Sequence, residues 1–568
     1  MLRLAKIQFS YKQLFILLSL AALGIMPLLS LGYGITFDEW MDSNNGMLTL
    51  RHILNPGDQS FMEFWHGYLY SQLFYVTVGT VYGLLHGNLA LLAQNGLLQE
   101  AHLIPFFTTS HIINSLFGFL GILYTGLLAK RIGGWRAGCL AFLFLALSPR
   151  YLGNAMNDPK DIPFAAAHIF AVYYLIRFLD DLPKIRFKTS LLLTLGISAV
   201  IGTRIGGMIQ INYLFLFSAL TYLYLRWIKR NPQMKFWKLA LAVTGISIAG
   251  YLGGIFFWPY GQSNPLVHPF EAIKEVSNFR FWEGLLLFDG KLILSTHLPW
   301  DYIPKWILIS SPLYFVLALI LFLILLKPFI QTYRLRLWLP LLFISLFPIV
   351  FVILKKSMLL DSWRHLLFVY PPLVVLAALV WEYLLRYAHS GAKKLLVWSI
   401  ILFHLSLPLG WMIKNHPNAY VYFNELVGGI NGAFGRYETD YWGNSLRAAS
   451  EWLVRYHNSH APSAPAIVRA DGHFMSSYAY LKKGLGNRYH PAGYPKDLLK
   501  KDPFTYVGYA PYLGGHPEWD YALVLSRGWS PEILRSLAWP PIGTIYTVKA
   551  DDVVLCAVVK NPKRPSPP

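Results

Sequence analysis

About eleven long apolar runs constrain the fold of this chain of 568 residues more than any other feature. A helix needs about 20 apolar residues to cross ~30 Å of hydrocarbon, and most of the runs reach or approach that length. The runs are 13–33, 106–128, 137–152, 162–179, 189–206, 208–227, 238–258, 307–326, 338–354, 365–386 and 396–413. Charged residues make up only 14% of the chain, whereas soluble domains carry about a quarter. The sequence therefore predicts a polytopic helical membrane protein.

The basic loops set the orientation of these spans. Lysines and arginines precede the first run and follow the second, fourth, sixth, eighth and tenth runs, so all of them fall on one side of the membrane. Cytoplasmic loops carry such an excess, which predicts a cytoplasmic N-terminus. The first run has no clear small-residue cleavage site, and we expect an uncleaved helix. The net charge of +20 is spread through these loops, which favours lipid headgroups as partners over nucleic acid.

The segment 71–98 is apolar but does not fit this count. A single crossing there would reverse the side of every later basic loop, and the segment also carries polar residues such as His86 and Gln94. We therefore expect one or two interfacial helices within 60–100, lying on the outer face. Two additional spans joined by a short turn are the alternative.

The same count places a C-terminal domain outside the membrane. We expect a transmembrane domain over 1–413 and an extracytoplasmic domain over 414–568. Helical patterns at 445–456 and 476–483, with short apolar runs at 521–525 and 552–559, predict a small α/β fold. The two cysteines, Cys139 and Cys556, are too far apart in the chain to indicate a disulfide framework, and no metal site is indicated.

Carboxylates in the outer loops are the candidate catalytic groups. Asp38 and Glu39 follow the first span, and Asp158 and Asp161 lie in a short loop before the fourth. Poorly hydrated carboxylates of like charge have perturbed pKa values, which suits a general base. The alternative for each is a solvated loop acid or a helix N-cap, and Asp161 before Ile162-Pro163 fits an N-cap well.

Cations in the outer loops are the candidate binding groups for an anionic ligand. Basic side chains held at the membrane surface suit a phosphate or pyrophosphate whose lipid tail lies in the bilayer. The candidates are Lys160, Arg204, Arg280, Lys355, Lys356, Arg364 and His365. Simple snorkelling toward lipid headgroups is the alternative. We find no nucleophile signature of a Ser-His-Asp hydrolase and no phosphate-binding loop of an ATPase.

An ordered set of motifs resembles the GT-C superfamily of membrane glycosyltransferases. The resemblance is to the bacterial branch similar to protein O-mannosyltransferases and aminoarabinose (lipid A) transferases. The motifs are Phe37-Asp38-Glu39, Asn157-Asp158-Pro159-Lys160-Asp161-Ile162-Pro163, Leu298-Pro299-Trp300-Asp301-Tyr302-Ile303-Pro304, Trp363-Arg364-His365, the stretch 416–425 and the stretch 435–443. Two departures concern the acceptor. Asp440-Tyr441-Trp442-Gly443 differs in order from the peptide-binding motif of oligosaccharyltransferases, and the β-trefoil insertion of eukaryotic protein mannosyltransferases is absent.

The resemblance implies an inverting transfer of a sugar from a polyprenyl-phosphate donor to an acceptor hydroxyl at the outer face of a bacterial inner membrane. It implies Asp38 as the base, Glu39 as its orienting neighbour, and either Asp158 or Asp161 as a second acid. Lys160 and Arg364 are the implied ligands of the donor phosphate. The acceptor, a glycan, lipid or protein, and any need for a divalent metal are left open. Two other functions stay open as well: a flippase or transporter of polyprenyl-linked sugars, and a non-catalytic envelope assembly protein.

Overall fold

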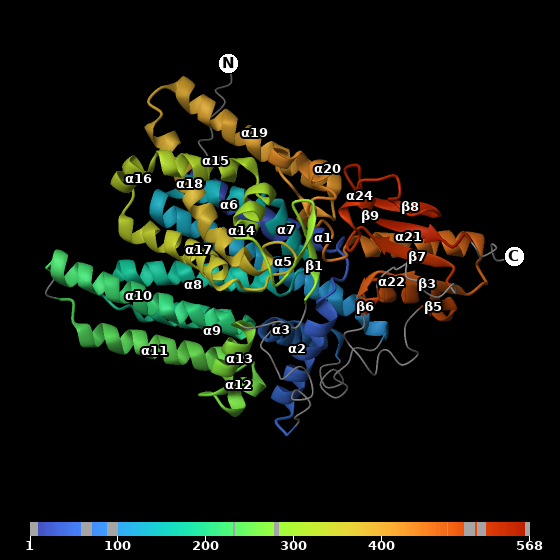
Figure 1. The fold of residues 1–568 in the computed structure, drawn as a ribbon. Helices are drawn as coiled ribbons and strands as arrows, with labels where there is room; N and C mark the ends of the chain where they lie inside the picture. The colour runs from blue at the N-terminus through green and yellow to red at the C-terminus, as the bar shows by residue number, and fades with distance from the viewer. Residues whose placement is uncertain are drawn as a thin grey trace, which may run out of the picture.

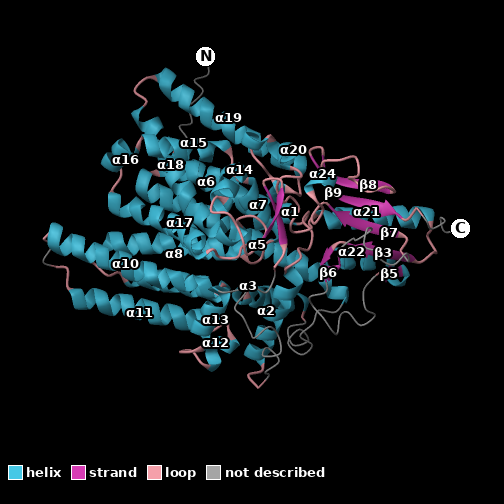
Figure 2. Ribbon diagram, in the orientation of Figure 1, coloured by secondary structure: helices cyan, strands magenta, loops and turns pink. Residues whose placement is uncertain are grey.

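The computed structural model describes residues 10–57, 71–87, 100–230, 233–277, 283–473, 475–492, 506–507 and 519–562. Within these ranges the chain forms a bundle of apolar helices with a small mixed α/β domain against one end (Figures 1 and 2).

Apolar helices account for the bundle. Among the described residues eight helical segments are long and apolar enough to cross a membrane, or up to ten if each of two bent pairs is one span. The helices are α1 (Tyr11–Ser30), α5 (Leu103–Gly133), α6 (Trp135–Ala146), α7 (Pro149–Asn157), α8 (Asp161–Asp181), α9 (Phe187–Thr203), α10 (Ile209–Leu223), α11 (Phe236–Ile255), α14 (Tyr302–Ser310), α15 (Leu313–Ile324), α16 (Leu326–Thr332), α17 (Leu335–Lys355), α18 (Tyr370–Tyr387) and α19 (Gly391–Asn415). Each of the eleven predicted runs overlaps at least one of these helices. The fifth run, 189–206, corresponds to α9, which at 17 residues is one of the shorter apolar helices and is not counted among the candidate spans.

Two of the predicted spans are bent. The axes of α6 and α7 differ by 64°, and those of α15 and α16 by 87°. Pro149 begins α7, and proline cannot donate the hydrogen bond that would continue the preceding helix. Pro328 in the first turn of α16 acts in the same way. The first bend matters for function because it directs α7 toward the C-terminal domain (Figure 1).

Burial shows which helices form the centre of the bundle. In the most apolar windows of the α8 and α18 segments, 83% and 94% of the residues are buried, against 17% for α1 and 22% for α19. The central helices α8 and α18 therefore begin in the interior, and polar side chains at their first turns are shielded from water.

Two helices between α1 and α5 are not among the candidate membrane spans. They are α2 (Glu39–Leu54) and α3 (Gln72–His86), and α3 has only 15 residues. Gly46 permits their close packing, since a Cβ there would lie 2.1 Å from the Cβ of Tyr75. This agrees with the predicted helices of the outer loop. The rest of the predicted interfacial segment, 58–70 and 88–99, falls outside the described residues.

The small domain contains a five-stranded sheet in the order β5-β3-β7-β9-β8. β3 pairs in parallel with β5 and β7, while β9 pairs antiparallel with β7 and β8. The strands are β3 (Ala466–Ala470), β5 (Tyr489–Pro491), β7 (Tyr521–Leu525), β8 (Thr544–Ala550) and β9 (Val553–Lys560). Two helices, α21 (Ser445–His460) and α22 (Met475–Leu485), belong to the same domain. The two predicted helices and two predicted strands are thus confirmed.

Shorter elements complete the described chain. They are α12 (Pro259–Ser263), α13 (His268–Ser277), α20 (Gly429–Ala433), α24 (Pro531–Leu534), the hairpin β1 (Leu285–Phe288) with β2 (Lys291–Leu294), the pair β4 (Gly472–His473) with β6 (Tyr506–Val507), and single-turn segments at Glu100–His102, Ile205–Met208, Tyr224–Ile228, Arg364–Val369, Ala419–Val421, Glu425–Val427 and Gly486–Arg488. The predicted domain boundary between 413 and 414 stays a prediction, because the chain around 420–442 packs in the same hydrophobic core as the bundle.

Candidate active site

The carboxylate of Asp38 contacts two cations at one end of the bundle. It occupies the N-cap position of α2 but makes no capping hydrogen bond with its side chain. Its Oδ2 instead lies 3.1 Å from Nζ of Lys160 and 3.3 Å from Nη2 of Arg364. The side chain of Asp38 is 26% exposed, whereas those of Asp42 and Asp161 are 2% and 0% exposed. Asp38 is therefore the most solvent-accessible of these three carboxylates.

A tight turn before α8 supplies Lys160. Oδ1 of Asp158 accepts hydrogen bonds from the backbone N–H groups of Lys160 and Asp161, at 3.2 and 3.1 Å. Aspartate commonly stabilises a turn in this way, with its own side chain bonding to the backbone that follows. The turn directs the ammonium of Lys160 to Asp38 and also to Oδ2 of Asp42, at 3.0 Å. Asp42 lies one helical turn after Asp38, so α2 presents both carboxylates to the same cation.

Asp161 pairs with two arginines from distant parts of the chain. Arg204, at the C-terminal end of α9, places Nη2 2.5 Å from Oδ1 of Asp161, and Arg364 places Nη1 3.4 Å from Oδ2. Asp161 begins α8, where a negative charge is also favoured by the helix dipole.

The turn before Arg364 is conformationally unusual. Asp361 and Ser362 both have positive φ, 54° and 67°, a region that costs a non-glycine residue about 1–3 kcal/mol. The turn lets Asp361 contact Nη2 of Arg364 at 3.1 Å and Nη2 of Arg527 at 2.5 Å. Arg527 follows β7, so this turn joins the bundle to the C-terminal domain.

Trp442 covers the guanidinium of Arg364. The Cζ atom of Arg364 lies 4.5 Å from the centre of the Trp442 ring, within cation–π distance. The indole Nε1 donates to Oδ1 of Asn154 on α7, at 2.9 Å. Asp440 supports this arrangement, since its carboxylate accepts backbone hydrogen bonds from Asn444 and Ser445 at the start of α21. The 435–443 motif thus holds the C-terminal domain against the charged cluster.

The balance of burial and charge gives the carboxylates different pKa values. Burial would raise the pKa of Asp38, but the charges of Lys160 and Arg364 outweigh it and lower that pKa below the usual range. Burial raises the pKa of Asp42 to about 6 despite Lys160. The pKa of Asp158 is raised well above the usual value, by burial and then by the charge of Asp161. Burial lowers the pKa of Lys160, but Asp38 and Asp42 reverse this and raise it. At neutral pH, Asp38 and Lys160 are therefore both ionised.

The remaining predicted site residues lie in different places. Glu39 points away from the cluster: it is fully buried, accepts the backbone N–H of Thr36 at 2.6 Å, and lies 3.0 Å from Nε2 of His111. His365 is half-buried beside Arg364. Lys355 and Lys356 are exposed where α17 ends, and neither forms an ion pair with any described residue. Arg280 falls outside the described residues.

Sequence reasoning missed several members of the cluster. The structure adds Asp42, Asp361, Arg527 and Trp442. The position of Asp42 at i+4 from Asp38 was a usable signal, because such residues share a helix face. Nothing in the local sequence marks Arg527, which reaches the site only through the packing of the C-terminal domain.

Across the described residues no group of three His, Cys, Asp or Glu side chains is arranged to hold a metal ion.

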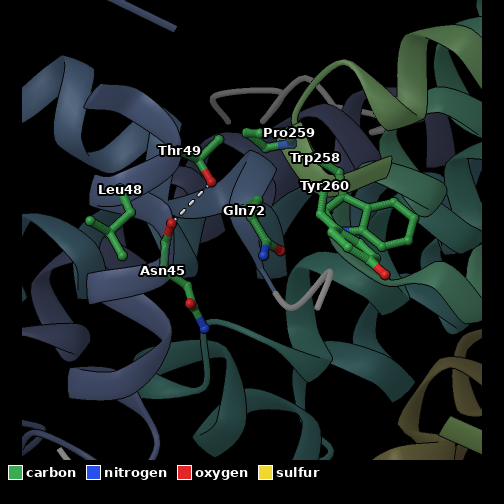
Figure 3. A pocket seen from close by; sticks show the side chains of 7 residues that line it. All are labelled: Asn45, Leu48, Thr49, Gln72, Trp258, Pro259 and Tyr260. Carbon is green, nitrogen blue, oxygen red and sulfur yellow. Dashed lines mark hydrogen bonds between the residues drawn. The ribbon is translucent and has the colours of Figure 1, made fainter. Parts of the chain in front are cut away.

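A small recess lies farther along α2. It has an empty volume of about 230 Å³, including its opening to solvent, and is lined by Asn45, Leu48, Thr49, Gln72, Trp258, Pro259 and Tyr260 (Figure 3). Asn45 and Thr49 continue the helix face of Asp38 and Asp42, and the hydroxyl of Thr49 donates to the backbone oxygen of Asn45 at 3.0 Å. Polar side chains therefore extend along α2 from the charged cluster to this recess.

The chain is similar in fold to ArnT. The apo structure of ArnT from Cupriavidus metallidurans aligns with a TM-score of 0.46 at 13% identity, covering 97% of this chain and 98% of ArnT. The structure of that ArnT bound to undecaprenyl phosphate gives 0.43 at 13% identity, over 83% of this chain and 75% of ArnT. The oligosaccharyltransferase of Archaeoglobus fulgidus gives 0.41 at 12% identity, over 83% and 64%.

ArnT and the oligosaccharyltransferase are GT-C superfamily members, the class that the sequence motifs resemble. No family model matches the chain, and no curated protein matches it. With identities of 12–13% and TM-scores below 0.5, these likenesses leave the chemistry of the site to its own residues.

Proposed function

We propose that this protein is a membrane glycosyltransferase that moves a sugar from a polyprenyl-phosphate donor to an acceptor hydroxyl, with inversion, at the outer face of the membrane. The observation that carries the proposal is the shared contact at Asp38, where one accessible carboxylate oxygen meets both Lys160 and Arg364. A base and two phosphate-binding cations within contact distance are the groups that such a transfer requires.

The chemistry divides between these groups. The acceptor oxygen attacks the anomeric carbon, the carbon–oxygen bond to the phosphate breaks, and the phosphate leaves with the bonding electrons. Asp38 takes the proton of the acceptor hydroxyl. Lys160 and Arg364 stabilise the charge that develops on the departing phosphate, and Arg204 and Asp161 hold Arg364 in position.

The same contacts link donor binding to the strength of the base. Lys160 and Arg364 keep the pKa of Asp38 low by their charges. A donor phosphate competes with Asp38 for those cations, and each hydrogen bond that shifts to the phosphate lets the pKa of Asp38 rise toward its ordinary value. Asp38 therefore becomes a better proton acceptor when a donor is bound.

The placement of charged residues also favours a transferase over a sugar transporter and over a non-catalytic assembly protein. In the described bundle the ion pairs lie at its ends: the Asp38 cluster at one, and Asp180 with Arg131 and Arg336 at the other. A transporter for a polar sugar needs polar side chains near the midplane. A non-catalytic assembly protein would have no need for an accessible carboxylate between two buried cations.

Transfer from a panel of radiolabelled polyprenyl-phosphate sugars, by purified protein in lipid, tests the proposal. We expect the wild type to release label from the lipid in the presence of cell-envelope acceptors, and Asp38→Asn to lose that release. No release by the wild type across the panel would contradict a transferase. Equal release by the two proteins would contradict Asp38 as the base.

A further inference from the structure

Arg150 is a buried arginine that faces no carboxylate within 4 Å among the described residues. The residue is 3% exposed, and the hydroxyl of Tyr441 is a hydrogen-bonding neighbour whose geometry is too poor for a full hydrogen bond to any of the three guanidinium nitrogens. In contrast, Lys160, Arg204 and Arg364 each face at least one carboxylate within 4 Å. A buried charge without a partner is strongly disfavoured, so the position of Arg150 calls for an explanation.

Aromatic rings compensate only part of this cost. The Cζ atom of Arg150 lies 5.1 Å from the ring centre of Trp306 and 5.0 Å from that of Phe423. Such contacts stabilise the charge through the ring faces. They supply no acceptor for the five N–H groups of the guanidinium.

Further hydrogen-bonding groups with incomplete pairing surround Arg150. The indole Nε1 of Trp306 and the hydroxyl of Tyr302, one turn apart on α14, are buried; they interact with each other, and neither makes a full hydrogen bond with a described residue. Tyr302 and Tyr441 also interact electrostatically with Arg150. A guanidinium and an indole can only donate, so the tyrosine hydroxyl oxygens are the acceptors in this set and its donors outnumber them. Oxyanions are the ligands that arginine binds best.

One carboxylate of the chain is near enough to compete. Glu438 is buried and interacts electrostatically with Arg150, but the two form no ion pair within 4.0 Å. The cation nearest to Glu438 is Arg527, whose Nε lies 4.0 Å from Oε1. Pairing with Glu438 is therefore the intramolecular explanation against which a ligand has to be tested.

We propose that Arg150, Trp306 and Tyr302 form an anion subsite that binds a phosphate or carboxylate group of a substrate. The assignment of that group to a substrate rests on the proposed function. The subsite adjoins the charged cluster through Asn154, one turn after Arg150 on α7, which accepts the indole hydrogen of Trp442, and Trp442 covers Arg364. Because Lys160 and Arg364 are assigned to the single phosphate of the donor, Arg150 serves a second oxyanion: an acidic group on the transferred sugar or on the acceptor.

Equilibrium binding of radiolabelled inorganic phosphate to the full-length protein in nanodiscs of zwitterionic lipid tests the subsite. We expect saturable binding by the wild type and by the control Arg436→Met, which removes a half-exposed arginine elsewhere. Arg150→Met should bind phosphate roughly 30-fold more weakly or not at all, because it loses a charge-assisted contact in a buried site. Arg150→Lys should fall between them. Phosphate binding by Arg150→Met equal to that of the wild type would overturn the proposal.

Competition with undecaprenyl phosphate then identifies the source of the oxyanion. Retention of phosphate at saturating lipid assigns the subsite to an acidic group on the sugar or the acceptor. Displacement would show that the only phosphate of the lipid binds at Arg150, and would overturn the second anion subsite. Trp306→Phe keeps the ring and removes the N–H, so it should weaken phosphate binding severalfold even if Arg150→Met does not fold. No effect of Trp306→Phe or Arg150→Lys would contradict the subsite.

The variant Glu438→Gln distinguishes anion binding at Arg150 from intramolecular pairing of Arg150 with Glu438. If the subsite binds an anion, this variant should bind phosphate as tightly as the wild type or more tightly. Equal losses of thermal stability in Glu438→Gln and Arg150→Met, with no further loss in the double variant and no change in phosphate binding, would show that Arg150 simply pairs with Glu438. Phosphate binding is measured without sugar transfer, so a missing subsite and an inactive transferase give different results.

Discussion

Arg364 and Asp38 form an ion pair of 3.3 Å that joins the turn before the central helix α18 to the turn before the outer helix α2. Arg364 also contacts Asp161 and Asp361, so one guanidinium connects three segments that are far apart in the chain. The candidate site is therefore a product of how the bundle closes at its outer end.

Replacing Asp38 tests the base. We expect Asp38→Asn to lower turnover about 10²-fold or more, since general-base assistance contributes about 10²–10⁴-fold. Expression and thermal stability should change little, because Asp38 is the most exposed of the four carboxylates that contact Lys160 or Arg364. The exposed acid Glu532, changed to Gln, is the matched control in the transfer assay. Turnover of Asp38→Asn within threefold of that control would remove Asp38 from the mechanism.

Replacing Arg364 tests its structural role. Arg364→Met removes one of two cationic partners from each of Asp38, Asp161 and Asp361, and breaking a buried ion pair costs up to about 3–5 kcal/mol. We expect a large fall in thermal stability in detergent, and a clearly smaller fall for Arg436→Met. Asp38→Asn in the Arg364→Met background should recover part of the loss, since the two residues are in contact. Additive effects of the two changes would argue that their pairing has no energetic consequence.

Replacing Lys160 should reduce turnover much more than replacing Lys355 and Lys356. Lys160→Met should reduce turnover at least tenfold, because it removes a cation held between Asp38 and Asp42. The double variant Lys355→Met/Lys356→Met should keep turnover within about threefold in neutral lipid, since both side chains are exposed. The comparison uses initial rates at several donor concentrations. A larger loss in the double variant would restore Lys355 and Lys356 as donor ligands.

Glu39 should matter for stability more than for chemistry. Its carboxylate contacts His111 and the backbone of Thr36 and does not reach Lys160 or Arg364. We expect Glu39→Gln to lower the free energy of unfolding by about 1–3 kcal/mol, the usual cost of weakening a buried hydrogen-bonded group. Rates per folded molecule should change less than for Asp38→Asn. A purified, fully folded Glu39→Gln protein with no activity would return Glu39 to the catalytic machinery.

Glu438 should make stability depend on pH. Burial raises its pKa to about 8, although Arg527 opposes the rise. Between about pH 4.5 and 8 the folded state then holds a proton that the unfolded state has released, so this group's contribution to stability falls as pH rises and levels off above 8. Wild-type melting temperatures over this range, set beside those of Glu438→Gln, should differ in slope, with the flatter curve for the variant. Parallel curves would show that Glu438 titrates normally.

The sequence by itself determined the membrane class, the positions of the apolar helices and the main elements of the C-terminal domain. These properties depend on hydropathy and residue preference summed over neighbouring residues, which are readable from the chain. The sequence also singled out the loops of Asp38, Lys160 and Arg364. Only the tertiary structure decided how these loops meet. It also shows that Glu39 contacts His111 and that Asp42, Arg527 and Trp442 belong to the charged cluster. Ion pairs between distant segments depend on how the helices pack and which charges that packing buries, and no local pattern records this.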